Sequence, residues 1–95
     1  LSSSYSALNK LSLYPNPLGA GDLNVEFTIN NPIIKTASFR ILDPAFNQIE
    51  NITISVNQGK NLIQLPSTKM KSGFYYIQMI HTSETVTQKI VVKKS

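Results

Sequence analysis

The sequence contains no cysteine and only one histidine, His81. Without cysteine the chain can form neither a disulfide framework nor a thiolate metal site, and it offers no cysteine nucleophile. It also lacks any apolar run near the roughly 18–20 residues that span a membrane as a helix, and its first residues lack the charged-then-apolar pattern of a signal peptide. We therefore expect a fold that is held by core packing alone, with no membrane insertion.

Residues suited to catalysis are equally sparse. His81 has no carboxylate within ten residues except Glu84, so the sequence supports neither a histidine-based metal cluster nor a catalytic triad. We interpret His81 as an exposed histidine at the end of a strand. The closest pair of carboxylates, Asp22 and Glu26, falls on a strand without the hydrophobic pocket that an acid–base pair usually needs. The sequence thus predicts no enzyme activity, no bound metal and no cofactor.

Charge of one sign is in modest excess, with nine Lys and Arg against five Asp and Glu and a net charge of +4. Such a charge could attract an acidic partner such as nucleic acid or lipid headgroups. The basic residues are spread along the chain, however, and Phe74 and Tyr76 have no lysine or arginine beside them in their strand. Single-stranded nucleic acid is bound by aromatic and basic side chains on one surface, so we expect no nucleic-acid partner.

The length of 95 residues fits one domain with a modest core. The first ten residues, Leu1–Lys10, are rich in serine and show no sustained apolar period, which is typical of a flexible linker. The remainder, Leu11–Ser95, shows the alternating apolar and polar residues of half-buried strands, with turn signals about every 8–12 residues. This pattern predicts an all-β fold, a single immunoglobulin-like antiparallel β-sandwich of about seven strands. The predicted strands are 11–14, 23–30, 36–41, 49–56, 62–65, 74–81 and 86–93.

Two local features of these strands lead to specific expectations. Ile49 is out of phase with Ile52, which predicts a β-bulge near Asn51. In the turn DPAFNQ, which begins at Asp43, we expect Asn47 to take the left-handed backbone conformation, because asparagine tolerates it at low cost.

The strand predicted at 74–81 has two apolar faces. Tyr75 and Ile77 share one face, which we assign to the core. Phe74, Tyr76 and Ile80 share the other, which points outward. The outward face could be covered by the second sheet, by a partner or by a second copy of the domain, and the sequence leaves these alternatives open.

Three short segments combine unusual residues, and each has a structural explanation. The segment YPNPLGAG contains Pro15, Asn16 and Pro17, which are typical of a rigid corner. We expect this corner between the linker and the sandwich. GFYYI places Gly73 two residues before Tyr75, as in immunoglobulin-like domains where a tyrosine hydroxyl fastens a corner. The last segment, QKIVVKKS, is typical of an edge or pairing strand whose lysines discourage edge-to-edge aggregation.

Taken in this order, the three segments resemble the type A C-terminal sorting domain of proteins exported by the type IX (Por) secretion system. The resemblance covers Leu11–Ser95. The matching positions are Pro15, Asn16 and Pro17 for the proline motif of the family, Gly73 and Tyr75 for its glycine–tyrosine motif, and Lys89, Ile90, Val91, Val92 and Lys93 for its closing lysine–hydrophobic motif.

Two positions depart from the family pattern. The family usually has glycine in a central D-x-x-G turn, where Asn47 stands in for it in our interpretation. It also often has glycine in the last hairpin, where this chain has HTSET. Neither departure touches the closing motif, so both bear on the geometry of the hairpins.

The resemblance implies an export signal carried by a larger cargo protein, with no catalytic role. In this family the cargo crosses the inner membrane by its own signal, and the outer-membrane translocon then recognises the sorting domain. A sortase of the cysteine-protease class typically removes the domain and joins the cargo to an anionic lipopolysaccharide, although some cargo is released. For this chain the cut would fall in or before Leu1–Lys10, and the cargo would be secreted or held at the cell surface.

We expect the translocon to recognise the closing strand. A final strand can add to a partner's sheet through its backbone while its side chains set the register. Lys89 and Lys93 share one face, about 13 Å apart, where they could meet carboxylates. The expected recognition residues are Lys89, Ile90, Val91, Val92, Lys93 and Lys94.

A second hypothesis is an immunoglobulin-like accessory module that binds carbohydrate or another extracellular ligand. It would need exposed aromatic residues near loop tips, for which Tyr14 and Phe46 are the candidates. It gives no reason for a final strand flanked by lysines.

Overall fold

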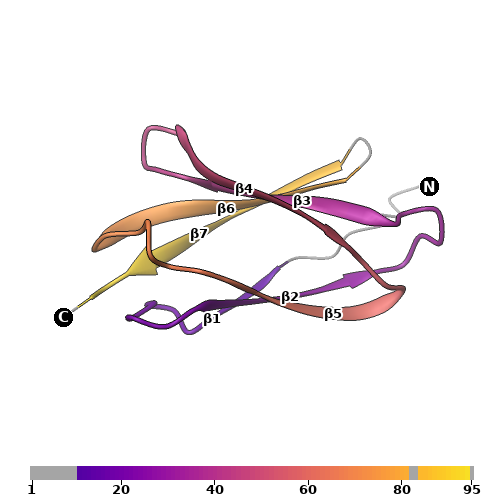
Figure 1. The fold of residues 1–95 in the computed structure, drawn as a ribbon, viewed down its shortest axis with the longest axis horizontal. Helices are drawn as coiled ribbons and strands as arrows, with labels where there is room; N and C mark the ends of the chain where they lie inside the picture. The colour runs from indigo at the N-terminus through magenta and orange to yellow at the C-terminus, as the bar shows by residue number, and fades with distance from the viewer. Residues whose placement is uncertain (1–10, 82–83, 95) are drawn as a thin grey trace, which may run out of the picture.

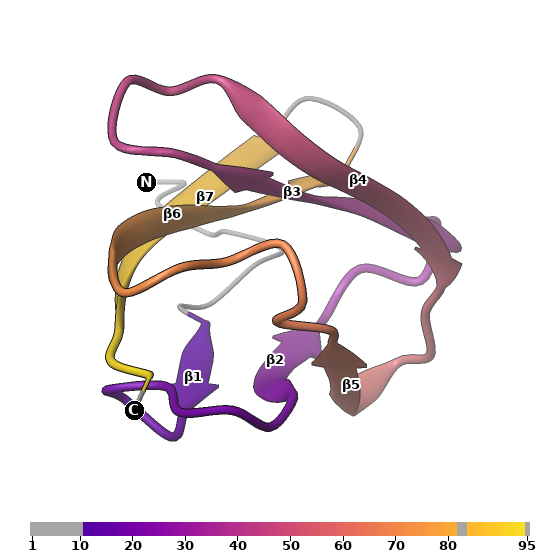
Figure 2. The same cartoon turned by 60° about the vertical axis from the view of Figure 1, so that its left-hand side comes forward.

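The structure, a computed structural model, describes residues 11–81 and 84–94. These residues form seven strands in two antiparallel sheets that pack as a sandwich (Figures 1 and 2). One sheet has three strands in the order β1-β2-β5, and the other has four in the order β4-β3-β6-β7. The strands are β1 (Ser12–Tyr14), β2 (Leu23–Ile29), β3 (Thr36–Leu42), β4 (Gln48–Ser55), β5 (Gly59–Leu65), β6 (Gly73–His81) and β7 (Glu84–Val92). The predicted all-β sandwich is confirmed, whereas the predicted linker Leu1–Lys10 lies outside the described residues.

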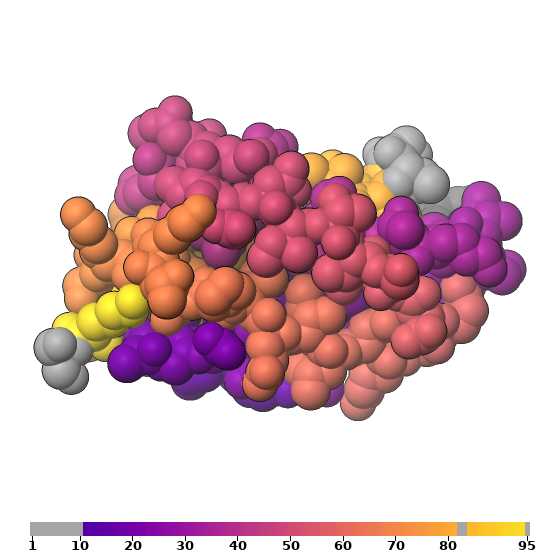
Figure 3. All heavy atoms as spheres, viewed as in Figure 1, coloured from indigo at the N-terminus to yellow at the C-terminus, as the bar shows by residue number. Residues whose placement is uncertain are grey.

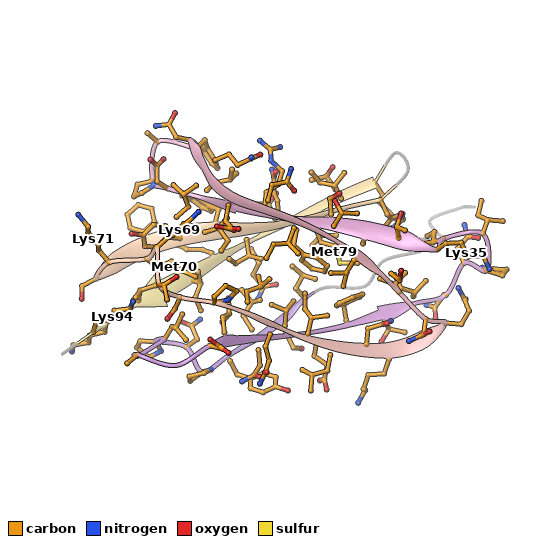
Figure 4. The ribbon with its side chains drawn as sticks, viewed as in Figure 1. Lys35, Lys69, Met70, Lys71, Met79 and Lys94 are labelled. Carbon is orange, nitrogen blue, oxygen red and sulfur yellow. The ribbon has the colours of Figure 1, made fainter. Side chains whose placement is uncertain are left out.

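The core lies between the sheets because each inner strand turns every second side chain towards it. In β2 all four alternate residues from Leu23 to Ile29 are at most 2% exposed. The facing side of β6 contributes Tyr75, Ile77 and Met79, and Met79 is seen between the two sheets in Figure 4. Period-two alternation in the sequence therefore translates directly into burial. No helix occurs among the described residues, and so none that could cross a membrane.

The predicted β-bulge exists, but it lies two residues before the predicted position. Ile41 of β3 faces Glu50 of β4, while the next residue, Leu42, faces Gln48, so Ile49 is the extra residue. Asn51 keeps a normal partner in the ladder. The out-of-phase residue is itself the one that bulges, and its side chain packs against the core.

The prediction of an exposed His81 is wrong. The side chain of His81 is 2% exposed, and its Nε2 lies 3.4 Å from Oε1 of Glu84 across the last hairpin. His81 follows Ile77 and Met79 at two-residue spacing, so the alternation of β6 turns it inward with them. The two-residue alternation that predicts the core residues of β6 therefore also predicts the burial of this histidine.

Candidate functional site

The proline segment forms a contact with the closing strand that the sequence did not predict. The segment follows β1, so it is a corner between β1 and β2 and not between linker and sandwich. The backbone N–H of Leu18 donates to the carbonyl of Val91 (2.7 Å), and the N–H of Lys93 donates to the carbonyl of Leu18 (2.8 Å). Asn16 Oδ1 accepts from the N–H of Val91 at 3.3 Å. The corner therefore occupies the outer edge of β7 at its end, where Figures 2 and 3 show the chain after β1 beside the yellow C-terminal segment.

The closing motif divides into side chains that face the core and side chains that face outward. Ile90 and Val92 are 0% and 2% exposed and belong to the core. Lys89, Val91 and Lys93 are exposed, which confirms the predicted alternation of the last strand. Only these three side chains of the motif can be touched directly by a partner.

Lys94 is fastened to the loop between β5 and β6. Its Nζ donates to the carbonyl of Ser67 at 2.7 Å, and its backbone N–H donates to Oγ of Ser72 at 2.9 Å. Figure 4 shows Lys94 at the same end of the molecule as Met70 and Lys71, with Lys35 at the opposite end. These bonds anchor the chain after β7, so they indicate a structural task for Lys94.

Aromatic side chains gather on the outer face of the four-stranded sheet. The ring of Phe46, in the β3–β4 turn, stacks on Tyr76 with centroids 4.6 Å apart, and Phe74 meets Tyr76 edge-on at 5.8 Å. Nζ of Lys89 lies 4.4 Å from the centroid of Phe74, within cation–π range. Val91 is 41% exposed opposite Phe74 in the ladder. We call Phe46, Phe74, Tyr76, Lys89 and Val91 the aromatic patch. Because the second sheet packs on the other face, it does not cover this patch.

The turn that carries Phe46 is fixed by Asp43. One carboxylate oxygen of Asp43 accepts the backbone N–H of Asn47 (2.8 Å) and that of Ala45 (2.9 Å). The side-chain amide of Asn47 donates to the other oxygen at 3.3 Å. The backbone N–H of Asn47 is the largest cause of a lowered pKa for Asp43, because these donors stabilise the carboxylate form. The turn thus keeps its anchor charged in mild acid.

The left-handed residue of this turn is Phe46, with φ of 65°, so the prediction for Asn47 is wrong. Asn47 gives both its backbone and side-chain N–H groups to Asp43, and it closes the turn in that way. Counted from Asp43, the glycine place of the D-x-x-G pattern falls on Phe46. A bulky residue is unusual there, since the left-handed region costs roughly 1–2 kcal/mol for residues other than glycine.

The glycine–tyrosine motif fastens the start of β6. Gly73 has φ of 144°, a conformation that side chains disfavour. Two residues later, the hydroxyl of Tyr75 accepts the backbone N–H of Lys71 at 2.8 Å. This bond ties the end of the β5–β6 loop to the strand that follows it, so the predicted tyrosine corner is confirmed.

Replacing Tyr75 by phenylalanine is expected to lower the free energy of unfolding by about 1 kcal/mol, because the N–H of Lys71 loses its acceptor while the ring still fills the core. Urea denaturation measures the loss. The matched control is Tyr76→Phe on the outer face, which should change stability little. Equal effects of the two substitutions would contradict a role for the hydroxyl bond.

The acidic side chains of residues 11–81 and 84–94 are distributed over several strands and turns. These residues contain no group of three histidine, cysteine or acidic side chains that could hold a metal ion. Glu26 and Glu50 lie in separate ion pairs with Lys60 (4.0 Å) and Lys69 (2.9 Å). These two carboxylates form surface ion pairs, and the aromatic patch with the closing strand is the candidate site of the described chain.

The fold and this surface define a small β-sandwich module that presents a braced final strand. Residues 12–93 match the family described as the secretion system C-terminal sorting domain. The chain belongs to this family, the sorting signals of type IX secretion, so it implies a cargo protein, the secretion machinery, and a cargo that is secreted or held at the cell surface. A comparison with curated proteins gave no match.

The accessory-module hypothesis receives no support from the comparisons or the fold. Tyr14 is 41% exposed and Phe46 is 57% exposed, but Tyr14 belongs to the three-stranded sheet and Phe46 to a turn of the four-stranded sheet. The two candidate aromatic residues are thus not gathered on one sheet face.

Proposed function

We propose that the domain acts as a folded, non-enzymatic signal that the outer-membrane translocon of the type IX system recognises on a larger cargo protein. The cargo passes through the periplasm and the outer membrane, a sortase cuts in or before residues 1–10, and the cargo is joined to the cell surface. The observation that carries this proposal is the family match over residues 12–93. The exposed side chains of the closing motif support it, because a signal must offer a surface to its receptor.

Within the closing motif, direct recognition belongs to Lys89, Val91 and Lys93. Their side chains are exposed, whereas Ile90 and Val92 lie in the core and position them. Lysines at an interface rim attract carboxylates of the partner and fix its register. Lys94 contributes by anchoring the chain to the β5–β6 loop.

The backbone of β7 offers a second means of recognition. β7 ends the order of its sheet, and the proline corner bonds to its outer edge only at Val91 and Lys93. Among the described residues, Thr85–Lys89 have no strand on that side, so an extended segment of the translocon can pair there. Such pairing would end before Val91, where the proline corner already occupies the edge of β7.

The test fuses the full chain to a periplasmic reporter in a host that has this secretion system and measures the fraction of reporter at the cell surface. Lys89→Glu and Lys93→Glu replace attraction by repulsion, so each should lower that fraction by at least about tenfold, equivalent to about 1.4 kcal/mol. The control is Lys35→Glu, an exposed lysine at the opposite end of the molecule.

Each result of this test has a distinct meaning. A parent fusion that stays in the periplasm would show that the domain is not an export signal for this system. A parent fusion that is exported together with equally exported Lys89 and Lys93 variants would show that recognition lies elsewhere on the domain.

A further inference from the structure

Phe46 combines an unfavourable backbone conformation with an exposed aromatic ring. Its φ is 65° and its side chain is 57% exposed. Glycine would adopt this conformation without steric cost, and the exposed ring gains little from the core. A strained residue that is kept on the surface indicates a functional role. The contacts of the Phe46 ring therefore bear on what that role is.

The ring of Phe46 extends a continuous surface across two strands. It stacks on Tyr76, which meets Phe74, whose other neighbour is Lys89 of β7. Val91 lies opposite Phe74 and adds an aliphatic side chain. Phe46 therefore links the β3–β4 turn to the exposed part of the closing motif in one surface.

Positive charge is in excess around this surface, although Asp43 in the Phe46 turn is a carboxylate. Lys89 lies in the aromatic patch and Lys93 is exposed just beyond β7. The carboxylate of Asp43 beneath Phe46 is engaged by the N–H groups of its own turn, and Glu50 is paired with Lys69 at 2.9 Å. A complementary partner is one that brings carboxylates together with apolar side chains.

We propose that the aromatic patch is the docking surface for an acidic segment of the type IX machinery that carries apolar or aromatic side chains, with Phe46 as its central contact. This inference rests on the proposed function and adds to it a site outside the closing motif. Aromatic residues, phenylalanine and tyrosine among them, are enriched at protein–protein interfaces relative to the rest of the surface.

Two other occupants fit this surface less well. The polar side chains beside the patch are already bonded to one another, since Arg40 donates to Gln48 and Gln78, and Gln78 donates to Thr87. They leave few groups to bind sugar hydroxyls. A second copy docked face to face would bring together two patches that both carry an excess of positive charge, because Lys89 lies within each of them.

The first experiment compares Phe46→Gly with Leu62→Ala in the full-length chain fused to the reporter. Leu62 is 56% exposed on β5, so the control removes an equally exposed apolar side chain from the other sheet. Phe46→Gly should unfold cooperatively and yet reach the cell surface about tenfold less than the control, as expected for a central interface contact. Thermal unfolding of both variants separates a loss of docking from a loss of fold.

A second experiment measures docking directly on the purified chain by following amide chemical shifts. The probe is a synthetic peptide of alternating glutamate and leucine, and its counterpart has lysine in place of glutamate. Shifts at Phe46, Tyr76 and Lys89 with the acidic peptide alone, lost in Phe46→Gly, support the proposal.

The remaining outcomes overturn it. Shifts with lipopolysaccharide but not with the acidic peptide would identify lipopolysaccharide as the occupant, and shifts that grow with protein concentration alone would identify a second copy. Equal export of Phe46→Gly and Leu62→Ala from an exported parent would remove this inference and leave the proposed function intact. A parent that is not exported would instead remove the proposed function.

Discussion

Deletion of the last seven residues, Lys89–Ser95, is expected to unfold the domain and not merely to silence a signal on an intact fold. The deleted segment contains Ile90 and Val92, which are 0% and 2% exposed in the core. Burial of two such side chains contributes about 3–6 kcal/mol, which is a large share of the roughly 5–15 kcal/mol that holds a small domain folded. Far-ultraviolet circular dichroism and urea titration of the shortened chain measure this loss.

The deletion also removes the partners of the proline corner. Leu18 bonds through its backbone to Val91 and Lys93, so both bonds disappear with the segment. The control is the double variant Lys89→Glu and Lys93→Glu, which changes charge but keeps the backbone and the two core residues. It should unfold cooperatively, with a urea midpoint near that of the parent chain. A shortened chain with an unchanged urea midpoint would contradict this account. Loss of export after deletion therefore cannot by itself locate the signal, which is why charge reversal is the better test.

The sequence was sufficient to predict most of the fold because alternation records burial directly. The strands around Val25, Phe39 and Ile77 each alternate with period two, and each turns its apolar residues inward. The chemistry of a histidine predicts a surface position for His81, whereas its place in that same period predicts burial. Its exposed fraction of only 4% follows from its position in the strand.

The candidate site was predictable only in part, because its contacts join distant parts of the chain. Alternation separated the exposed Lys89 and Val91 from the buried Ile90. It carried no information on Asn16, which bonds to Val91 across 75 residues of sequence. Residue type predicts the left-handed conformation at Asn47, yet the structure has it at Phe46, while Asn47 bonds to Asp43. Propensity describes single residues, and turn geometry is decided by the whole set of bonds.

Replacing Leu18 by alanine is expected to lower the free energy of unfolding by about 2–5 kcal/mol, the usual cost of emptying a fully buried leucine site. Leu18 is 0% exposed and pairs with Val92 as an isolated bridge between the proline corner and β7. Leu18→Met keeps most of the volume and should cost less than about 1.5 kcal/mol. Combining Leu18→Ala with Val92→Ala in a double-mutant cycle should give a coupling energy of about 0.5–3 kcal/mol, as is usual for residues in contact.

A second buried leucine provides the control that tests whether the proline corner positions β7 for recognition by the translocon. Leu13 of β1 is 9% exposed and lies in the three-stranded sheet, without a bond to β7 among the described residues. Leu18→Ala and Leu13→Ala should both destabilise the sandwich. Alanine at position 18 keeps the two backbone bonds to Val91 and Lys93, but only Leu18→Ala removes the buried side chain that holds the corner against β7, and so loosens the strand end at Lys93. Export of the reporter, compared at a temperature where both variants are folded, should therefore fall further in Leu18→Ala. Equal export would show that the proline corner stabilises the fold without positioning the strand that the translocon recognises.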